Sequence, residues 1–331
     1  MSENNAVFSS ALDTVGNTPL VKIKASPAEA SVYAKLETFN PGGSVKDRIG
    51  KYMLEKMLER GEIKSGGAVI EPTAGNTGIG IAIAANNLDL EAIFVVPEKF
   101  SLEKQELMRA LGADVINTPT EDGMQKAINY AHDLAKKREN AAVPQQFSNP
   151  LNAEAHYNIT APEIHQALDG QIGAIVLGCG TVGTLTGTAR FFREKNPRTF
   201  VAAVEPEGSL FSSLLNRDQD IQEEDYNIEG IGTHRPETNE LFHPELVDEV
   251  IQVDDRTAHE ELNRLAREEG HLVGSSSGAA SAAALKIADR IAQNRLEVPH
   301  NTVVTLFPDS GERYLSNDIY KSYEEWINSE K

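Results

Sequence analysis

Short apolar runs alternate with segments of helical periodicity along most of this chain, and this alternation is the strongest constraint on its fold. The apolar runs predict buried strands at residues 68–70, 92–96, 174–177, 201–204 and 303–307. Between them, helical periodicity covers residues 49–60, 102–111, 124–137, 185–195, 258–269 and 279–293. This order predicts an α/β fold with mostly parallel sheets and helices on both faces.

The length of the chain sets the expected number of domains. At 331 residues it exceeds a typical single core, so two domains are expected. A strand is expected to end in the polar turn Ser148-Asn149-Pro150, which favours a boundary there and gives domains 1–152 and 153–331. Residues 216–244 are polar, acidic and poorly periodic, which is typical of a long surface excursion.

Composition and charge exclude several functional classes. Apolar residues make up 40% of the chain, but no apolar run approaches the length of a membrane span. Residues 1–10 lack the basic and apolar regions of a signal peptide, so we expect a cytoplasmic protein. A net charge of −19 repels phosphate backbones and argues against nucleic-acid binding.

Cysteine and histidine usage argues against a metal centre. Cys179 is the only cysteine, so the chain forms no internal disulfide and no thiolate cluster. A small buried residue is the favoured interpretation of Cys179, because no adjacent base is evident to activate it. The eight histidines show no metal-ligand spacing, and we expect no metal.

Lys46 lies in the first of several polar motifs, each at a strand end or helix start, where ligands of open α/β sheets bind. It follows the turn Pro41-Gly42-Gly43, and Ser44 is suited to cap the helix that begins there. A lysine in the first helical turn opposes the helix dipole, which would help depress its pKa and favour imine formation with an aldehyde. An ordinary exposed lysine is the alternative.

The second motif covers residues 71–78 and links the strand at 68–70 to a helical run at 79–85. The sequence Thr73-Ala74-Gly75-Asn76-Thr77 brings backbone N–H groups and hydroxyls to a helix start, which makes a cradle for a carboxylate. A strand-to-helix turn with ordinary capping residues is the alternative.

The third motif is a glycine-rich loop between a strand and a helix, Gly178-Cys179-Gly180-Thr181-Val182-Gly183-Thr184. Glycine lets the backbone approach a phosphate closely, and the helix N-terminus supplies partial positive charge. The pattern is also compatible with a dinucleotide-binding fold, in which Glu205 lies at the spacing expected of the ribose-binding acid.

The fourth motif, Gly274-Ser275-Ser276-Ser277-Gly278, again precedes a helix. A serine hydroxyl at this point is suited to face a heteroaromatic nitrogen. A serine that only caps the helix is the alternative.

The order of these motifs resembles the fold-type II pyridoxal-phosphate enzymes, and within them the cysteine synthase/cystathionine β-synthase family. The likeness covers nearly the whole chain and includes residues 16–20, 40–50, 71–80, 145–150, 180–187, 229–232, 274–280 and 308–314. It implies a tryptophan synthase β-like fold of two three-layer αβα domains, with pyridoxal 5′-phosphate in the cleft between them. Residues near 18–38 would cross over to pack on the second domain.

The resemblance also implies a role for each motif. Lys46 would be the catalytic residue and carry the cofactor as an imine, and Asn76 would hydrogen-bond the phenolate oxygen of the cofactor. Ser276 would meet its pyridine nitrogen. Its phosphate would be held by Gly180, Thr181, Gly183 and Thr184. The substrate carboxylate would be bound by Thr73, Ala74, Gly75, Thr77 and Gln146.

The implied reaction is β-replacement on O-acetylserine. Lys46, displaced by the amino acid, would act as base on the Cα proton, and the β-substituent would leave. Sulfide or homocysteine would then add to the resulting aminoacrylate. Ser276 is neutral and would leave the pyridine nitrogen unprotonated, which favours β-elimination over transamination.

Two segments depart from the family pattern. Ala74 stands where many cysteine synthases have serine, which removes one hydrogen-bond donor worth about 1 kcal/mol. After Gly-Ile-Gly, the usual continuation is small and apolar, but this chain has Thr233-His234-Arg235-Pro236-Glu237. These side chains could line the mouth of the site and select a larger or charged nucleophile. A surface loop without substrate contact is the alternative.

Several alternatives and partners stay open from the residues alone. Serine/threonine dehydratase-type deamination is one alternative, and an idle relative that binds a partner is another, although retention of Lys46 argues against idleness. The resemblance implies a homodimer, and the loop at residues 73–77 suits a peptide carboxylate such as the C-terminus of serine acetyltransferase. Neither the tandem regulatory domain nor the haem extension of long cystathionine β-synthases is expected. Sulfide and homocysteine, and O-acetylserine, serine and O-phosphoserine, are not distinguished.

Overall fold

A computed structural model describes residues 7–216, 223–236 and 239–328 of the chain. The chain forms two compact units, Met1–Asn17 with Phe39–Gln145, and Thr18–Thr38 with Gln146–Lys331. Residues 18–38 thus belong to the second unit, and so do residues 146–152. The domain division at residues 152 and 153 remains a prediction, and each unit is described by itself.

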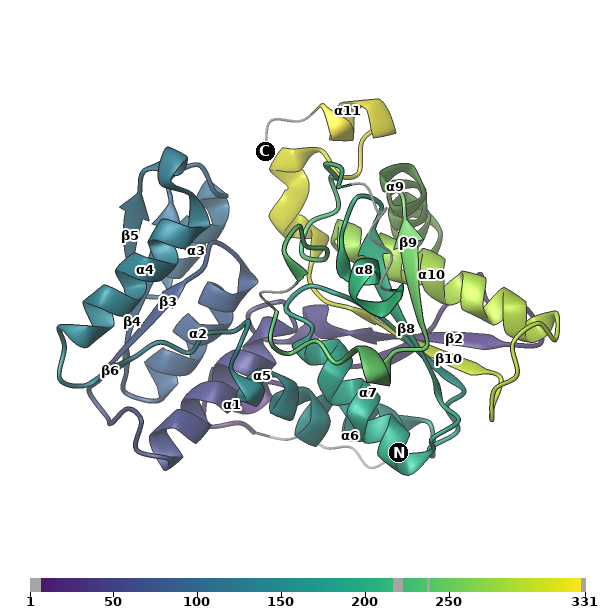
Figure 1. Cartoon of the computed structure of the whole chain (residues 1–331), viewed down its shortest axis with the longest axis horizontal. Helices are drawn as coiled ribbons and strands as arrows, with labels where there is room; N and C mark the ends of the chain where they lie inside the picture. The colour runs from purple at the N-terminus through teal and green to yellow at the C-terminus, as the bar shows by residue number, and fades with distance from the viewer. Residues whose placement is uncertain (1–6, 217–222, 237–238, 329–331) are drawn as a thin grey trace. The chain divides into compact units, whose positions relative to one another are not determined.

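The first unit contains a parallel sheet with the strand order β5-β4-β3-β6 (Figure 1). Its strands are β3 (Ala68–Pro72), β4 (Glu91–Pro97), β5 (Asp114–Thr118) and β6 (Ala141–Ala142). Its helices are α1 (Lys46–Glu59), α2 (Asn76–Asn87), α3 (Leu102–Ala110) and α4 (Gly123–Lys136), with 3-10 turns η1 (Ala11–Thr14) and η3 (Thr120–Asp122). The 3-10 turn η2 (Glu37–Phe39) lies before α1 in the chain.

Both faces of this sheet are buried. Ile70 and Ile93 pack with Ala127 of α4 on one face. Val69 and Phe94 point to the opposite face, because neighbouring strand residues alternate, and they are fully buried as well. Burial on both faces explains why these strands read as continuous apolar runs in the sequence.

The second unit contains a larger sheet with the order β1-β2-β10-β7-β8-β9. Only the β1–β2 pair is antiparallel among the described strands, in agreement with the predicted α/β class. The strands are β1 (Leu20–Lys22), β2 (Ser31–Leu36), β7 (Ala174–Gly178), β8 (Phe200–Pro206), β9 (Glu249–Val253) and β10 (Thr302–Phe307). The helices are α5 (Pro150–Ala155), α6 (Ala161–Ala167), α7 (Gly183–Lys195), α8 (Phe211–Asn216), α9 (Asp255–Arg264), α10 (Ser275–Ala292) and α11 (Tyr323–Ile327).

Short helical turns complete the second unit. Two π-turns, η4 (His156–Thr160) and η7 (Leu265–Glu269), extend α5 and α9. The remaining turns are η6 (Pro244–Leu246) and η8 (Gly311–Asn317). The core of the unit packs β2, β7, β8, β9 and β10 against α9 and α10, with Val176, Val303 and Ile287 among its members.

The strand predictions are confirmed, but several helices begin earlier than predicted. α1 begins at residue 46 rather than 49, α2 at 76 rather than 79, α7 at 183 rather than 185, and α10 at 275 rather than 279. Each early turn consists of the polar or glycine residues of a motif, which carry no apolar periodicity. The periodic signal therefore starts one turn late, and the motif residues lie at the helix N-termini.

Two further predictions need correction. β6 ends at Ala142, so no strand runs into the turn at residues 148–150; instead Asn149 caps α5 by accepting a hydrogen bond from Leu151 N at 3.0 Å. Among residues 223–236 and 239–243, which the structure describes, there is no α-helix or strand. This segment is nevertheless not a plain surface excursion, because Ile228 and Ile231 are buried in the core.

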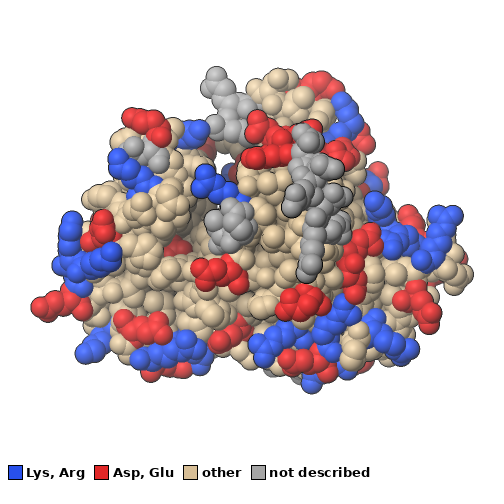
Figure 2. All heavy atoms as spheres, in the orientation of Figure 1, with Lys and Arg blue, Asp and Glu red and all other residues tan. Residues whose placement is uncertain are grey.

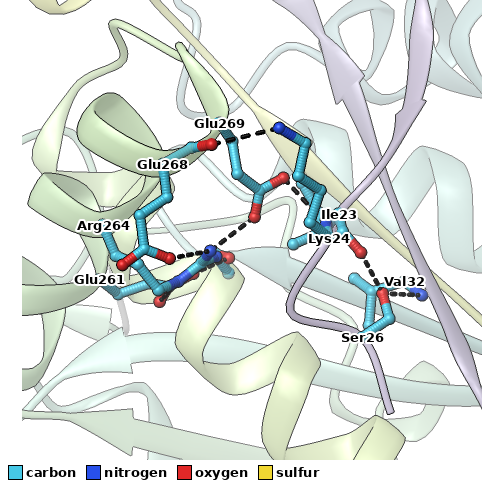
Figure 3. Close-up of polar contacts among 9 residues, drawn as sticks. Ile23, Lys24, Ser26, Val32, Glu261, Arg264, Glu268 and Glu269 are labelled. Atoms are coloured by element: carbon cyan, nitrogen blue, oxygen red, sulfur yellow. Dashed lines mark hydrogen bonds and ion pairs between the residues drawn. The ribbon is translucent and has the colours of Figure 1, made fainter. Parts of the chain in front are cut away.

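An ion-pair cluster holds the β1–β2 hairpin to the end of α9 (Figure 3). The Arg264 guanidinium lies 2.7 Å from Glu261 and 2.6 Å from Glu269. Glu269 also accepts a hydrogen bond from Lys24 N at 2.9 Å, and Lys24 Nζ donates to the Glu268 carbonyl. The hairpin is thereby joined to the end of α9 by two hydrogen bonds of Lys24, one from its backbone N–H and one from its side chain.

A second charged pair lies inside the unit. Lys35 Nζ lies 2.7 Å from Glu163 of α6, and the two side chains are 2% and 14% exposed. Lys35 Nζ also donates to the Thr18 carbonyl at 2.7 Å. Ions at this depth are tolerated only when they are paired, so the pair links β2 to α6.

Lys35→Met should therefore destabilise the second unit by about 3–5 kcal/mol, because it removes the cation beside the Glu163 carboxylate, whose side chain is only 14% exposed. The double variant with Glu163→Leu should recover most of that loss. Urea unfolding followed by Trp326, the sole tryptophan, measures both. The exposed pair Lys56–Glu59 supplies the control, since Lys56→Ala should cost less than about 1 kcal/mol. Equal costs at Lys35 and Lys56 would contradict this account.

A second prediction about stability concerns His259 on α9. It is 5% exposed, and its ring stacks on Trp326 at 5.1 Å between ring centroids. Burial lowers the pKa of His259 below its ordinary value. The unfolded chain therefore takes up a proton at a pH where the folded chain does not, and the stability of the fold falls as the pH drops below about 6.5.

Replacing this side chain with His259→Phe should flatten the decline by at most about 1.4 kcal/mol per pH unit, one proton's worth. The measurement is the free energy of urea unfolding by circular dichroism between pH 8 and pH 5. His243→Ala, at an exposed histidine, is the matched control. An unchanged slope in the His259 variant would show that another group carries the decline.

Helix hydropathy and surface charge complete the description. In the part of the chain that the structure describes, helices long and apolar enough to cross a membrane are absent. On the face drawn in Figure 2, acidic and basic side chains are interspersed.

Candidate functional site

The predicted site residues divide between the two units. Lys46 and the loop Thr73–Thr77 belong to the first unit. Gln146, the loop Gly180–Thr184 and Ser276 belong to the second. Each set is described within its own unit.

Lys46 is the first residue of α1 and is half-buried. Ser44 Oγ accepts a hydrogen bond from Lys46 N at 3.2 Å, although the cap position itself is Val45. The Asp47 carboxylate accepts another from Gly42 N. The buried side chains of Ser44 and Asp47 thus hold the glycine turn against the helix start, and the backbone of Lys46 has one defined position.

Two glycines bring this helix start against α2. A Cβ at Gly50 would overlap the Gly80 carbonyl, and a Cβ at Gly80 would lie against the Lys46 carbonyl, so neither position has room for a side chain. Gly80 lies one turn after Asn76, on the same side of α2. The structure therefore brings Lys46 together with the N-terminal turns of α2.

The loop at residues 73–77 turns from β3 directly into α2. Gly75 is the N-cap residue, and its N–H donates to Thr73 Oγ1 at 3.4 Å. Asn76 and Thr77 form the first helical turn, Thr73 and Thr77 are buried, and Ala74 is half-buried. A helix N-terminus with its first N–H groups unused inside the helix is a binding site for an anion such as a carboxylate.

In the second unit, the glycine loop links β7 to α7. A Cβ at Gly180 would overlap the Gly230 carbonyl, and one at Gly183 would overlap Asn152. Close approach of this kind leaves the N–H groups at the start of α7, with the Thr181 and Thr184 hydroxyls, as the donors of the loop. This donor set fits a phosphate group.

Val182 is the N-cap residue of α7 and has a left-handed backbone, with φ 55°. A β-branched residue in this region costs roughly 1–2 kcal/mol. Surrounding bonds hold it there: Asn239 Nδ2 donates to the Gly180 carbonyl at 3.0 Å, and Gly232 N donates to the Cys179 carbonyl. A strained backbone that surrounding hydrogen bonds hold in place is typical of a ligand-binding loop.

Ser276 lies in the first turn of α10 and is 4% exposed. A Cβ at Gly230 would lie 4.0 Å from Ser276 Oγ, and Ser275 Oγ accepts a hydrogen bond from Glu229 N at 3.0 Å. Since Gly230 also abuts Gly180, it is the point where the glycine loop and Ser276 come together. Gly230 lies in the Glu229–Gly232 motif of the family resemblance, but no role was predicted for it.

Asn152 is a site residue that sequence analysis missed. It is fully buried, and its Nδ2 donates both to the Gln146 carbonyl at 2.7 Å and to Thr181 Oγ1 at 3.1 Å. The structure thus brings Gln146 to the glycine loop. The sequence contains one signal for this contact. Asn152 and His156 are four residues apart, a spacing that puts both on one side of a helix.

The structure agrees with the interpretation of Cys179 as a small buried residue, but it does not support Glu205 as a ribose-binding acid. Cys179 is fully buried. Burial, and to a smaller extent the nearby Glu205 carboxylate, raises the pKa of its thiol well above the ordinary value, so the thiol stays protonated. Glu205 is equally buried and accepts hydrogen bonds from Phe211 N at 2.8 Å and Ser212 N at 3.1 Å. Its carboxylate caps α8 and does not serve a ribose.

His234 lies just beyond the Gly230–Gly232 segment. Its ring stacks on Tyr226 at 5.1 Å, and its Nδ1 lies 3.1 Å from the Glu223 carboxylate. Burial raises the pKa of Tyr226 to about 12, so the stacked pair contains a neutral phenol. His234 and Arg235 are exposed, and Glu237 lies outside the described residues.

Comparison with known proteins identifies the chain as a pyridoxal-phosphate enzyme. The family model described as "Pyridoxal-phosphate dependent enzyme" matches residues 11–309, most of the chain. The chain therefore belongs to this family, and the fold is that of its fold-type II members. Its relatives place it more narrowly in the cysteine synthase/cystathionine β-synthase family.

Three relatives support that placement. An "O-acetylserine dependent cystathionine beta-synthase" of Bacillus subtilis (strain 168) is 43% identical over 318 residues, covering 95% of this chain and 98% of that protein. A "Cysteine synthase" of Helicobacter pylori (strain ATCC 700392 / 26695) is 45% identical over 313 residues, covering 93% and 97%. The crystal structure of an O-acetylserine dependent cystathionine beta-synthase from Helicobacter pylori matches with a TM-score of 0.83 at 42% identity, covering 95% and 99%.

Gly50→Ala should separate α1 from α2, because the added methyl group has only the rigid Gly80 carbonyl to displace. Overpacking of this kind costs about 1–3 kcal/mol, more than alanine gains in helix propensity. Hydrogen exchange of the α1 and α2 amides should accelerate, while β7 amides should not change. Glu59→Ala, at the exposed end of α1, is the control. Unchanged exchange in Gly50→Ala would refute the close contact.

Proposed function

We propose that this enzyme catalyses β-replacement on O-acetylserine, with sulfide or homocysteine as the group that adds at Cβ. The observation that carries the proposal is a half-buried lysine at the start of α1, held against the N-terminal turns of α2 through Gly50 and Gly80. The names of the Bacillus subtilis and Helicobacter pylori relatives supply the substrate class.

Each residue set has a defined task in this proposal. When bound, the cofactor withdraws electrons from Cα of the amino acid. Lys46 anchors the cofactor and, once released, accepts the Cα proton. Asn76 and Ser276 orient the cofactor ring by hydrogen bonds. The cofactor phosphate is held by Gly180, Thr181, Gly183 and Thr184. The substrate carboxylate is bound by Thr73, Ala74, Gly75, Thr77 and Gln146.

The helix N-termini explain how an acidic chain binds anionic ligands. The net charge is −19, yet the partial positive charge at the start of a helix acts within its first turn. The starts of α2 and α7 supply such charge to a carboxylate and to a phosphate. Ala74 contributes no hydroxyl, so backbone N–H groups carry more of the carboxylate binding.

The proposal extends to the cellular setting and to partners. We place the enzyme in the cytoplasm as a homodimer, in keeping with the family resemblance. A peptide that ends in a free carboxylate, such as the C-terminus of serine acetyltransferase, would present the same group as the substrate to the Thr73–Thr77 loop. Such a peptide should therefore compete with O-acetylserine.

The test is product analysis with O-acetylserine, offered sulfide and homocysteine in competition. Cysteine and cystathionine are the expected products, and their ratio identifies the preferred nucleophile. Lys46→Ala should lower kcat by about 10²–10⁴-fold, the usual contribution of a positioned base. Lys56→Ala, at a lysine of the same helix whose side chain is 33% exposed, should retain full activity.

Two outcomes would count against the proposal. Pyruvate as the main product, with or without a thiol, would assign the enzyme to β-elimination and deamination instead. Equal rates with serine or O-phosphoserine would remove O-acetylserine as the specific donor.

A further inference from the structure

A buried histidine lies directly behind the threonine that ends the glycine loop. His156 Nε2 lies 3.2 Å from Thr184 Oγ1, and His156 Nδ1 lies 2.9 Å from Thr160 Oγ1. His156 is 1% exposed and Thr160 is fully buried, whereas Thr184 is half-buried. The three side chains form a line that runs from the interior of the second unit to the loop.

The local backbone holds this line in place. His156 and Thr160 bound the π-turn η4, four residues apart, so their side chains share one side of the helix. On the facing helix, Gly187 lies one turn after Thr184, and a Cβ there would come within 2.9 Å of His156 Cβ. The missing side chain lets α7 pack directly on η4, which places the imidazole at the Thr184 hydroxyl. π-turns inside helices often occur at functional sites.

The direction of the hydrogen bonds decides what Thr184 offers to a ligand. A neutral imidazole has one donor and one acceptor nitrogen. If Nδ1 accepts from the Thr160 hydroxyl, Nε2–H donates to Thr184 Oγ1, and the Thr184 O–H proton is left to donate outward. In the reverse arrangement, Thr184 donates to Nε2, and its hydroxyl offers an anion only lone pairs.

We propose that His156, oriented by Thr160, is a positioning residue that turns the Thr184 hydroxyl toward the cofactor phosphate. The inference rests on the proposed function, in which Thr184 binds that phosphate. A phosphate carries only acceptor oxygens, so its binding selects the arrangement in which every bond in the line donates toward it. Hydrogen bonds aligned in one direction strengthen one another.

The proposed role of His156 concerns only the phosphate group of the cofactor, so the experiment compares a ligand that has this group with one that lacks it. Apoprotein of the full chain is titrated with pyridoxal 5′-phosphate and with pyridoxal, which lacks the phosphate. His156→Leu should weaken binding of pyridoxal 5′-phosphate by about 10- to 100-fold, the usual effect of losing a hydrogen bond to a charged group. The affinity for pyridoxal should change by less than about twofold, because this ligand makes no phosphate contact.

Two further variants test the line itself. His156→Gln retains an amide N–H donor and should recover most of the lost affinity. Thr160→Val keeps the histidine but removes the hydroxyl that orients it, so a loss of about 3- to 10-fold for pyridoxal 5′-phosphate is expected. The ³¹P resonance of the bound cofactor should shift in His156→Leu and Thr160→Val, which reports on the phosphate without any turnover.

His259→Leu is the matched control, since His259 is also a buried histidine on a helix of the same unit, bonded to Asn263 four residues on. Its ratio of the two affinities should equal that of the wild type. If His156→Leu weakened both ligands equally or neither, the inference would fail. Should His156→Leu not fold, the Thr160→Val ratio decides alone.

Failure of the proposed function gives a different result. If the wild-type apoprotein bound pyridoxal as tightly as pyridoxal 5′-phosphate, the glycine loop would not be a phosphate site at all. Normal discrimination in the wild type, unchanged in the His156 and Thr160 variants, would reject only the positioning role.

Discussion

The backbone N–H groups at the starts of α2 and α7 are the feature on which the proposed chemistry of this chain depends. Both helices follow a buried parallel strand directly, β3 and β7, through a loop of small residues. Backbone N–H groups that lack partners inside the helix must find acceptors, and anionic ligands supply them. In the loop before α7, Gly180 and Gly183 have no room for a side chain, because a Cβ would meet the Gly230 carbonyl or Asn152.

Strands and motif positions could be predicted from the sequence because both depend on local composition. The strand at residues 68–70 is buried on both faces, so it reads as an apolar run. Helix starts could not be predicted as well, because first-turn residues such as Asn76 and Gly183 are polar or glycine and add nothing to the apolar periodicity. The burial of Ile228 and Ile231 within a polar stretch depends on packing from distant segments, which no local pattern records.

The contacts of Asn152 and His156 could not be predicted from a local sequence pattern either. Asn152 and His156 contact Thr181 and Thr184 across about thirty positions of sequence, through side chains on the α5–η4 helix. Either residue alone resembles an ordinary buried polar group, and only the fold reveals the contact. Lys35 and Glu163 form another ion pair inside the same unit, and this pair links β2 to α6.

The burial of Cys179 has a practical consequence for measurement. The only thiol of the chain is enclosed and held protonated, so it should not react with alkylating reagents in the folded protein. A cysteine introduced at an exposed position of the first unit would then be the single label site without further engineering. Trp326, the only tryptophan, lies in the second unit and is a natural energy-transfer donor. One substitution would therefore make this enzyme a reporter of the distance between its two units during turnover.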